Sequence, residues 1–444
     1  MYNNGVLPMI FASRFLRCSI ALGIAIVVLV GVRNNRQFKT HTAPTHATNV
    51  FHVEGYPITN LPSTAKSLTY VASFTMAGEG MNLLPTTTGF LTRDNNRYIM
   101  HDWHDGHRRW QVTLVGETRW GQPHSAWSEA DNSSFALSDN GRYFTTSVVQ
   151  KHGVRVQRWF DGKPDGDCVV LSSRINPPQP GFYQLAIGNH GRILLQYYFE
   201  KHATPPDYLL VMDGRRIIAR ATLPARACIL PGGAMAFDSY TNILYAIHMK
   251  ANLIHFTRIA HIGPNYLQFP GNYILTENGA IYTPVGRALP PNPRHKISEH
   301  NRLRASYGLP TDWLVFSNNK EQHDIFSLST HACWSLKCNA EQEGITVSAN
   351  GRYVLMFKHD FFNSDKSEKQ TNSFGYEKDA IWLYERPGIL RAALCYNNSK
   401  FELPEGGRVF AESCYDWILS PDGRSVILKY QYMSIGGTAM LYHW

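Results

Sequence analysis

The sequence predicts an all-β protein, a β-propeller of seven or eight blades preceded by one N-terminal transmembrane or signal-anchor helix. Three observations lead to this fold. A turn of the type Ser-x-Asn/Asp-Gly-Arg recurs between pairs of apolar strands, and its copies return about every 45 to 50 residues. Aromatic residues make up 12% of the chain, which also has 34 Gly and 24 Pro, as expected for strands joined by tight turns. A period of 40–50 residues that holds four short strands is typical of a propeller blade.

The clearest copy of the repeat is 419–430, in which a strand, a Pro-Asp-Gly turn and a strand of alternating apolar residues follow one another. Segments 137–144, 187–194 and 347–355 have the same layout, and 90–100 is a degenerate copy. Each copy needs a residue that tolerates positive φ at its turn, which is the property of Gly and, less often, of Asn. The expected structural turns are therefore at Asn96, Gly141, Gly191, Gly279, Gly351 and Gly423.

The spacing of these turns sets the number of blades. Asn96 and Gly141 are 45 residues apart, and Gly191 follows 50 residues later. The 72 residues from Gly351 to Gly423 fall to near 50 once the polar insertion 359–379 is removed. A second long loop, 284–307, is rich in Pro and Arg, and a short helix is expected from residue 298. The chain ends in a strand at 441–444 that lacks a neighbour, so we expect 68–74 to pair with it and close the ring.

The N-terminus divides into three parts before the propeller. Residues 18–32 carry no charge; Arg precedes them, and Arg and Lys follow them. Fifteen residues are fewer than the ~20 that cross a bilayer, but residues 15 and 16 extend the segment if Arg17 snorkels to the interface. No small-x-small cleavage site follows promptly, which favours an uncleaved signal anchor; a cleaved secretory signal is the alternative. The expected organisation is a basic segment 1–17, the anchor 18–32, a flexible tether 33–66 and the propeller 67–444.

Seven cysteines are present, and one of them, Cys18, lies in the apolar segment. The other six form an even set, as disulfides of an exported protein would require, with buried thiols as the alternative. Cys333 with Cys338 and Cys395 with Cys414 are the expected disulfide pairs. No Cys-x-x-Cys occurs, so a zinc site is disfavoured.

The formal net charge of +9 comes from Lys and Arg scattered along the chain without a clustered basic stretch. This pattern describes a solvated surface, and no nucleic-acid partner is expected.

Metal-ligand residue types concentrate at 101–107, where the sequence reads His-Asp-Trp-His-Asp-Gly-His. His101, His104 and His107 are the candidate ligands. Strand alternation, however, directs His101 and His104 to opposite faces, and Asp105-Gly106 turns the chain before His107. A β-hairpin that carries His and Asp side chains without a bound metal is therefore favoured over a metal site. No nucleophile elbow, dinucleotide fingerprint or phosphate loop occurs, so no catalytic residue and no cofactor is assigned.

The motif Leu-Ser-Pro-Asp-Gly-Arg at 419–424 resembles the WD40-like repeats of TolB-type propellers. Asp105-Gly106 through Arg109-Trp110 is similar to a quinoprotein-like (PQQ-type) blade ending. The sequence departs from true WD40 repeats because it has no Trp-Asp dipeptide. It departs from quinoprotein dehydrogenases because it lacks the adjacent Cys-Cys pair that the resemblance implies. The resemblance therefore implies the fold and not the activity.

These features favour a membrane-anchored, extracytoplasmic, non-catalytic platform, attached through 18–32, that binds another protein at the propeller face. The loops 284–307 and 359–379 are the expected contact regions. The alternative is a propeller enzyme of hydrolase, lactonase or oxidoreductase type, with a metal or small ligand in the central funnel. An envelope-assembly scaffold ranks lower because no lipidated Cys follows the apolar segment.

Overall fold

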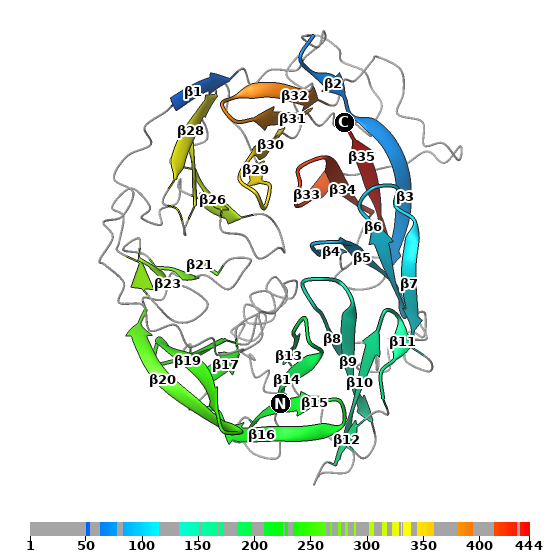
Figure 1. Ribbon diagram of the computed structural model, residues 1–444, viewed down its shortest axis with the longest axis vertical. Coiled ribbons are helices and arrows are strands. Elements are labelled where there is room, and N and C mark those ends of the chain that lie inside the picture. Colours follow the sequence, from blue (N-terminus) through cyan, green and yellow to red (C-terminus); the bar gives the residue numbers. More distant parts are fainter. Residues whose placement is uncertain are drawn as a thin grey trace, which may run out of the picture.

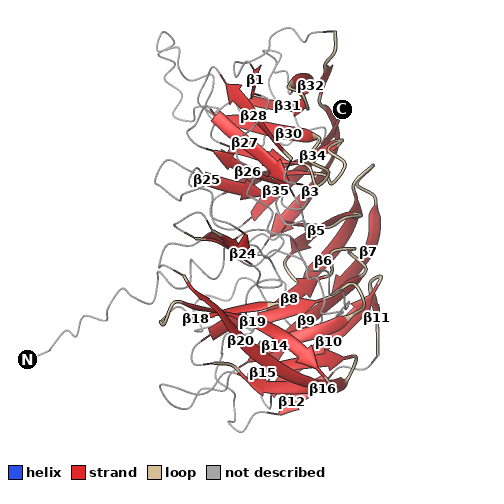
Figure 2. Ribbon diagram, turned by 60° about the vertical axis from the view of Figure 1, so that its left-hand side comes forward, coloured by secondary structure: helices blue, strands red, loops and turns tan. Residues whose placement is uncertain are grey.

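The computed structural model is all-β in the part of the chain that it describes, and its sheets are arranged as the blades of a propeller around a centre (Figure 1; Figure 2). The predicted all-β propeller is confirmed. The residues described are 50–53, 63–77, 83–114, 133–150, 153–166, 169–172, 184–197, 208–224, 227–229, 234–238, 240–262, 267–268, 274–276, 280–282, 288–289, 302–305, 313–317, 322–327, 330, 332–338, 344–358, 380–393, 413–432 and 436–444.

Hydrogen bonding groups the described strands into seven sheets, within which most strands consecutive in sequence are antiparallel neighbours. In the first half of the chain the blades consist of β4 (Leu83–Pro85), β5 (Gly89–Asp94), β6 (Arg97–Asp102) and β7 (Arg108–Thr113); β8 (Ser133–Leu137), β9 (Tyr143–Gln150), β10 (Gly153–Phe160), β11 (Lys163–Pro164) and β12 (Val169–Ser172); β13 (Gln184–Ile187), β14 (Arg192–Tyr197), β15 (Tyr208–Asp213) and β16 (Arg216–Thr222); and β17 (Ala227–Ile229), β18 (Met235–Asp238), β19 (Ile243–Lys250) and β20 (Leu253–His261).

The second half continues in the same way. Its strands are β21 (Leu267–Gln268), β22 (Ile274–Leu275), β23 (Ile281–Tyr282) and β24 (Ala288–Leu289); β25 (Arg302–Ala305), β26 (Trp313–Ser317), β27 (Gln322–Ser327) and β28 (Cys333–Cys338); β29 (Gly344–Val347), β30 (Tyr353–Lys358), β31 (Ala380–Glu385) and β32 (Ile389–Ala393); and β33 (Ser413–Leu419), β34 (Ser425–Tyr432) and β35 (Gly436–His443). Three strands precede all of these in sequence: β1 (Val50–Val53), β2 (Lys66–Ser67) and β3 (Thr69–Ala77).

The recurring turn is built around a buried serine. In the β8–β9 turn the Ser138 hydroxyl donates to Asn140 Oδ1 at 2.8 Å and accepts from the Tyr143 amide at 2.9 Å. The backbone amide of Gly141 donates to the Ser138 carbonyl at 2.8 Å. The turns that begin at Ser348 and at Ser420 repeat these bonds. In all three copies the serine hydroxyl and the glycine amide therefore make the same hydrogen bonds within the turn.

The glycine of each turn also lies against a neighbouring blade. Gly141, Gly191, Gly351 and Gly423 all have positive φ. A Cβ at Gly423 would come within 2.3 Å of the Tyr353 ring, and one at Gly351 within 2.1 Å of Trp313. Side chains at these positions are excluded both by backbone conformation and by the adjacent blade.

Two predicted turns differ from this pattern. Near Asn96 the residue with positive φ is Asn95, and the turn joins β5 to β6, so it lies at the opposite end of its blade from the Gly141 turn. The degenerate repeat at 90–100 is therefore one strand out of register with the other copies, and the prediction arises because Asp-Asn-Asn-Arg at 94–97 resembles Asp-Asn-Gly-Arg at 139–142. Gly279 lies outside the described residues.

The ends of the chain close the ring. β3 pairs antiparallel with β35 from Thr69↔His443 to Ala77↔Gly436, which confirms the predicted pairing of 68–74 with the C-terminus. β33, β34, β35 and β3 form the closing blade, and β3 meets β5 of the next blade at Ala77↔Asp94. Ring closure leaves no unpaired strand at this junction.

Part of the expected tether instead belongs to the propeller. β1 pairs in parallel with β28, and β2 pairs in parallel with β32, so residues 50–53 and 66–67 run along the outside of two blades (Figure 1). The polar composition of 33–66 concealed this pairing because backbone hydrogen bonds to an exposed strand edge need no apolar pattern.

The Cys333–Cys338 disulfide is not formed. Both residues lie on β28, five positions apart, so roughly 16 Å separates their Cα atoms, far beyond the ~7 Å limit of a disulfide. The Cys338 Sγ instead lies 3.6 Å from Met356 Sδ in the core. Cys414 is in β33, whereas its proposed partner Cys395 lies outside the described residues.

Within the described ranges no helix is long and apolar enough to cross a membrane. The predicted anchor 18–32 and the insertion 359–379 lie outside the described residues. In the loop 284–307, residues 298–301, where a short helix is expected to begin, lie outside the described residues, and 302–305 is strand β25.

The glycine contacts predict unequal effects of two matched substitutions. A Cβ added at Gly166, which has φ +81°, would have no atom within 4 Å, whereas Gly423 has φ +78° and the Tyr353 ring at 2.3 Å. We expect Gly166→Ala to lower the free energy of unfolding by about 1 kcal/mol through φ alone. Gly423→Ala adds a steric clash and should cost about 3 kcal/mol or more, measured by urea denaturation of the full chain. Equal losses would show that the blade contact at Gly423 contributes nothing.

Candidate functional site

The residues singled out by sequence at 101–107, which we call the seam loop, comprise the last two residues of β6 and the connection 103–107 to β7. This loop lies where the β4–β7 blade meets the closing blade. The Ser425 hydroxyl, at the start of β34, donates to the Trp103 carbonyl at 3.1 Å. Trp103 Nε1 in turn donates to the Thr86 carbonyl at 2.9 Å. The ring closure therefore fixes the position of the seam loop.

The side chain of His101 fixes the loop from its buried side. Its side chain is buried, with Nε2 3.0 Å from Thr92 Oγ1 and Nδ1 3.1 Å from the Gly106 carbonyl oxygen. The imidazole packs against the rings of Phe74 and Phe90. Burial lowers the pKa of His101 to about 4, so the ring is neutral at physiological pH. Both ring nitrogens have structural partners, and His101 is therefore not available as a metal ligand.

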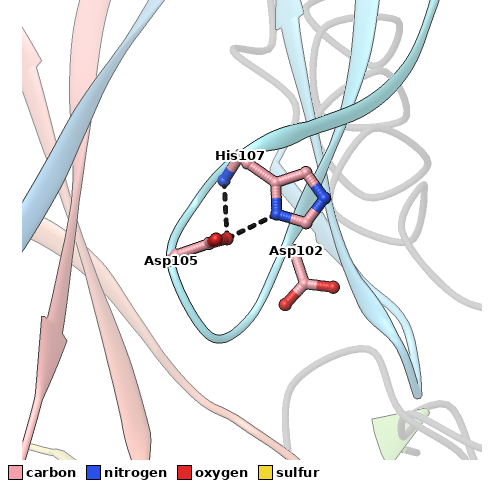
Figure 3. Close-up of side chains that lie close together, drawn as sticks. All are labelled: Asp102, Asp105 and His107. Carbon is pink, nitrogen blue, oxygen red and sulfur yellow. Dashed lines mark hydrogen bonds and ion pairs between the residues drawn. The ribbon is translucent and has the colours of Figure 1, made fainter.

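Three other side chains of the loop converge at the surface. The ligand atoms of Asp102, Asp105 and His107 lie within 4.8 Å of one another (Figure 3). Asp105 Oδ1 lies 2.5 Å from His107 Nδ1 and accepts the His107 amide at 3.0 Å. Asp102 Oδ1 accepts the amide of His104 at 2.8 Å. Hydrogen bonds to His107 lower the pKa of Asp105, which keeps this exposed carboxylate ionised.

The structure thus regroups the predicted residues. Of His101, His104 and His107, only His107 belongs to the cluster; His101 is buried at the end of β6, and His104 is exposed in the turn that follows. Asp102 and Asp105, which complete the cluster, were not predicted as ligands. Their signal in the sequence is Asp-x-x-Asp-x-His around the Gly106 turn. Carboxylate oxygens and an imidazole are donors that divalent cations accept, so within the described chain these three residues could hold a metal.

His104 instead faces the closing blade. Its ring lies 5.6 Å, centroid to centroid, from that of His443 at the end of β35, in an edge-to-face arrangement. Partial burial lowers the pKa of His443, and the proximity of His104 lowers it further. The junction between the β4–β7 blade and the closing blade therefore carries an imidazole from each blade.

A buried carboxyl lies in the neighbouring turn. Asp139 is only 3% exposed, and its Oδ1 has no hydrogen-bond partner in the described structure. Its backbone carbonyl accepts from the amide of Thr87 at 2.8 Å, which ties the turn to the adjacent blade. Burial raises the pKa of Asp139 to about 7.

No protein-family model and no curated protein matches the chain. Among solved structures, it is similar to the WD40 domain of SCAP from fission yeast (10% identity, TM-score 0.43, 85% of this chain and 95% of that one). It is also similar to BamB from Moraxella catarrhalis (11%, 0.39, 85% and 100%). A third is the dihydro-heme d1 dehydrogenase NirN (12%, 0.38, 85% and 72%). The chain is a β-propeller repeat protein by its own strand topology.

The raised pKa of Asp139 predicts a pH dependence of stability. Between about pH 4 and about pH 7 the folded chain keeps a proton on Asp139 that the unfolded chain releases, so the free energy of unfolding falls as pH rises. Asp139→Asn and Asp139→Ala do not titrate, and Ala349 occupies the same position of the 347–355 copy. Relative to the wild type, both variants should gain a few kcal/mol between pH 5 and pH 8 in urea denaturation. A constant difference across this range would refute the assignment.

Proposed function

We propose that this protein is a non-catalytic binding platform whose seam loop contacts a partner protein. The proposal is supported by the difference between the buried residues of the loop, which fix its backbone, and its surface side chains, which are polar. Buried His101 and the Gly106 turn hold the backbone, while Asp102, Asp105 and His107 present charged and polar atoms at the surface (Figure 3). Polar groups fixed before binding lose little conformational entropy on association, which favours recognition. Loops carried on a rigid scaffold are the usual place for such contacts.

The platform proposal predicts a loss of partner capture in a loop variant. The change is Asp102→Asn, Asp105→Asn and His107→Gln together, which removes the charges and keeps the side chains similar in size. Cross-linking of the tagged full chain in intact membranes should yield a discrete complex with the wild type and at least about tenfold less with the variant. The control is Asp161→Asn, which removes a carboxylate from the equivalent Asp-Gly turn of the next blade.

Two results would contradict the platform. Equal capture by the loop variant would place the contact elsewhere. Stoichiometric metal in the purified wild type, lost in the variant, would identify the cluster as a cation site and favour an enzyme. Elemental analysis and a small-molecule thermal-shift screen of the same preparations distinguish these outcomes.

We further propose that the chain is anchored in a membrane through 18–32, with the propeller outside the cytoplasm. The support is the uncharged composition of that segment and the basic residues on both sides of it. Since β1 begins at residue 50, seventeen residues (33–49) connect the anchor to the propeller, in place of the expected 34. Fully extended, this connection reaches at most about 60 Å. The propeller would therefore work close to the bilayer.

Membrane anchoring predicts that the full chain stays in the pellet after alkaline carbonate extraction, whereas a chain without 18–32 becomes extractable. A C-terminal tag should be degraded by protease added from the non-cytoplasmic side. Release of the full chain by carbonate would refute an integral anchor. Protection of the tag would reverse the orientation.

The ring is proposed to have eight blades. The closing blade (β33, β34, β35 and β3) and the β4–β7 blade share one sheet, and the six other sheets each contribute one blade. An experimental density map that resolves seven blades would refute this number.

A further inference from the structure

The outer strands of two blades already bind an extended segment. β28 pairs in parallel with β1 from Val50↔Ser335 to Val53↔Cys338. β32 pairs in parallel with β2 from Lys66↔Ala392 to Ser67↔Ala393. The outermost strand of a blade presents a row of backbone donors and acceptors, and an added strand satisfies them. The N-terminal part of this chain shows that the propeller accepts such a strand on its outside.

β20 offers a longer edge of the same kind. It is the outermost strand of the β17–β20 blade, runs for nine residues, and in the described structure pairs only with β19 (Figure 1). Ile254 and the partly buried Phe256 pack into a core that they share with Ala219 of β16. The alternate positions, Leu253 and His255 among them, are exposed. Strand alternation therefore exposes one row of β20 side chains, and among the described strands none pairs with its outer edge.

Basic residues surround this edge. β16 lies against β20, and the exposed side chains of β16, β19, β20 and the turn before β16 include several basic residues (Arg, Lys and His), which we call the basic belt. Its members are Arg215, Arg216, Arg220, His248, Lys250, His255, Arg258 and His261. In 208–224 and 240–262 the one exposed acid is Asp213, whose Oδ1 lies 3.2 Å from the guanidinium of Arg158. The belt thus has a net positive charge.

A strand edge beside a basic belt favours some classes of binding partner over others. A second copy of the chain would bring like charges together, which disfavours edge-to-edge self-association. A lipid surface or a nucleic acid would use the charges but leave the backbone edge unsatisfied. An extended acidic peptide uses both, and it can also cover Leu253, which is 59% exposed at the start of β20.

We propose that the outer edge of β20 binds an extended acidic segment of a partner protein, which adds to the blade as a parallel strand and pairs its carboxylates with the basic belt. This surface is separate from the seam loop, so the proposal does not depend on the platform contact there. The two fail independently.

The test uses the full chain and a synthetic ten-residue peptide of alternating Glu and Val, with both ends capped and a fluorophore attached. Fluorescence anisotropy at low salt should show saturable binding that weakens as salt is added. Arg258→Glu should weaken binding about tenfold. The matched control is Lys337→Glu, the same reversal of charge on β28, an outer strand already covered by β1, and it should leave binding unchanged.

Further probes separate strand addition from charge alone. A Gln/Val peptide tests the carboxylates, and a Glu/Val peptide with alternate amides N-methylated, in either register, tests the backbone donors. The Gln/Val peptide, and the N-methylated peptide whose methyl groups replace the N–H donors that face β20, should each bind at least about tenfold more weakly than the Glu/Val peptide; methylation in the other register should weaken binding less. The proposal is overturned if the Glu/Val peptide does not bind, if N-methylation in both registers has no effect, or if Arg258→Glu and Lys337→Glu weaken binding equally. Binding confined to phosphatidylserine vesicles or to a single-stranded oligonucleotide would overturn it in favour of a lipid or nucleic-acid surface.

Discussion

The pairing of β3 with β35 is the interaction on which the rest of the structure depends. It joins residues 69–77 to 436–443 over the full length of both strands, and it replaces two free edges with one continuous ladder. The same pairing brings His443 beside His104 and the Ser425 hydroxyl onto the Trp103 carbonyl. The seam loop is therefore shaped by contacts between opposite ends of the sequence, and local residues alone do not define it.

Within the ring, the repeated turn works as an inter-blade joint. Ser420 saturates the polar groups of its own turn, and Gly423 allows the turn to lie directly on the Tyr353 ring of the preceding blade. The corresponding joint at Gly191 lies on Tyr143. The motif that is most conspicuous in the sequence is thus structural. Candidate recognition surfaces lie in the connections and edges that do not repeat.

The outer edges of β28, β32 and β20 are of two kinds. β28 and β32 are covered by β1 and β2, whereas β20 carries no added strand in the described structure and is bordered by Arg and His side chains. A covered edge is neutralised by backbone pairing, and an exposed edge is protected by charge. Charge protection leaves the backbone groups available, which is the physical basis for binding an oppositely charged strand there.

By itself, the sequence determined the all-β propeller, the positive-φ glycines at 141, 191, 351 and 423, and the closure of the ring, because strand alternation and turn chemistry are local properties with a visible period. The local pattern was misleading in two places. The Asn95-Asn96 hairpin resembles the repeat turn in sequence, and residues 50–53, set within a polar stretch, gave no sign of pairing with β28. The cluster of Asp102, Asp105 and His107 and the basic belt were decided only by the tertiary structure. Both depend on which side chains face solvent after distant strands pack, and a linear pattern of charges does not contain that information.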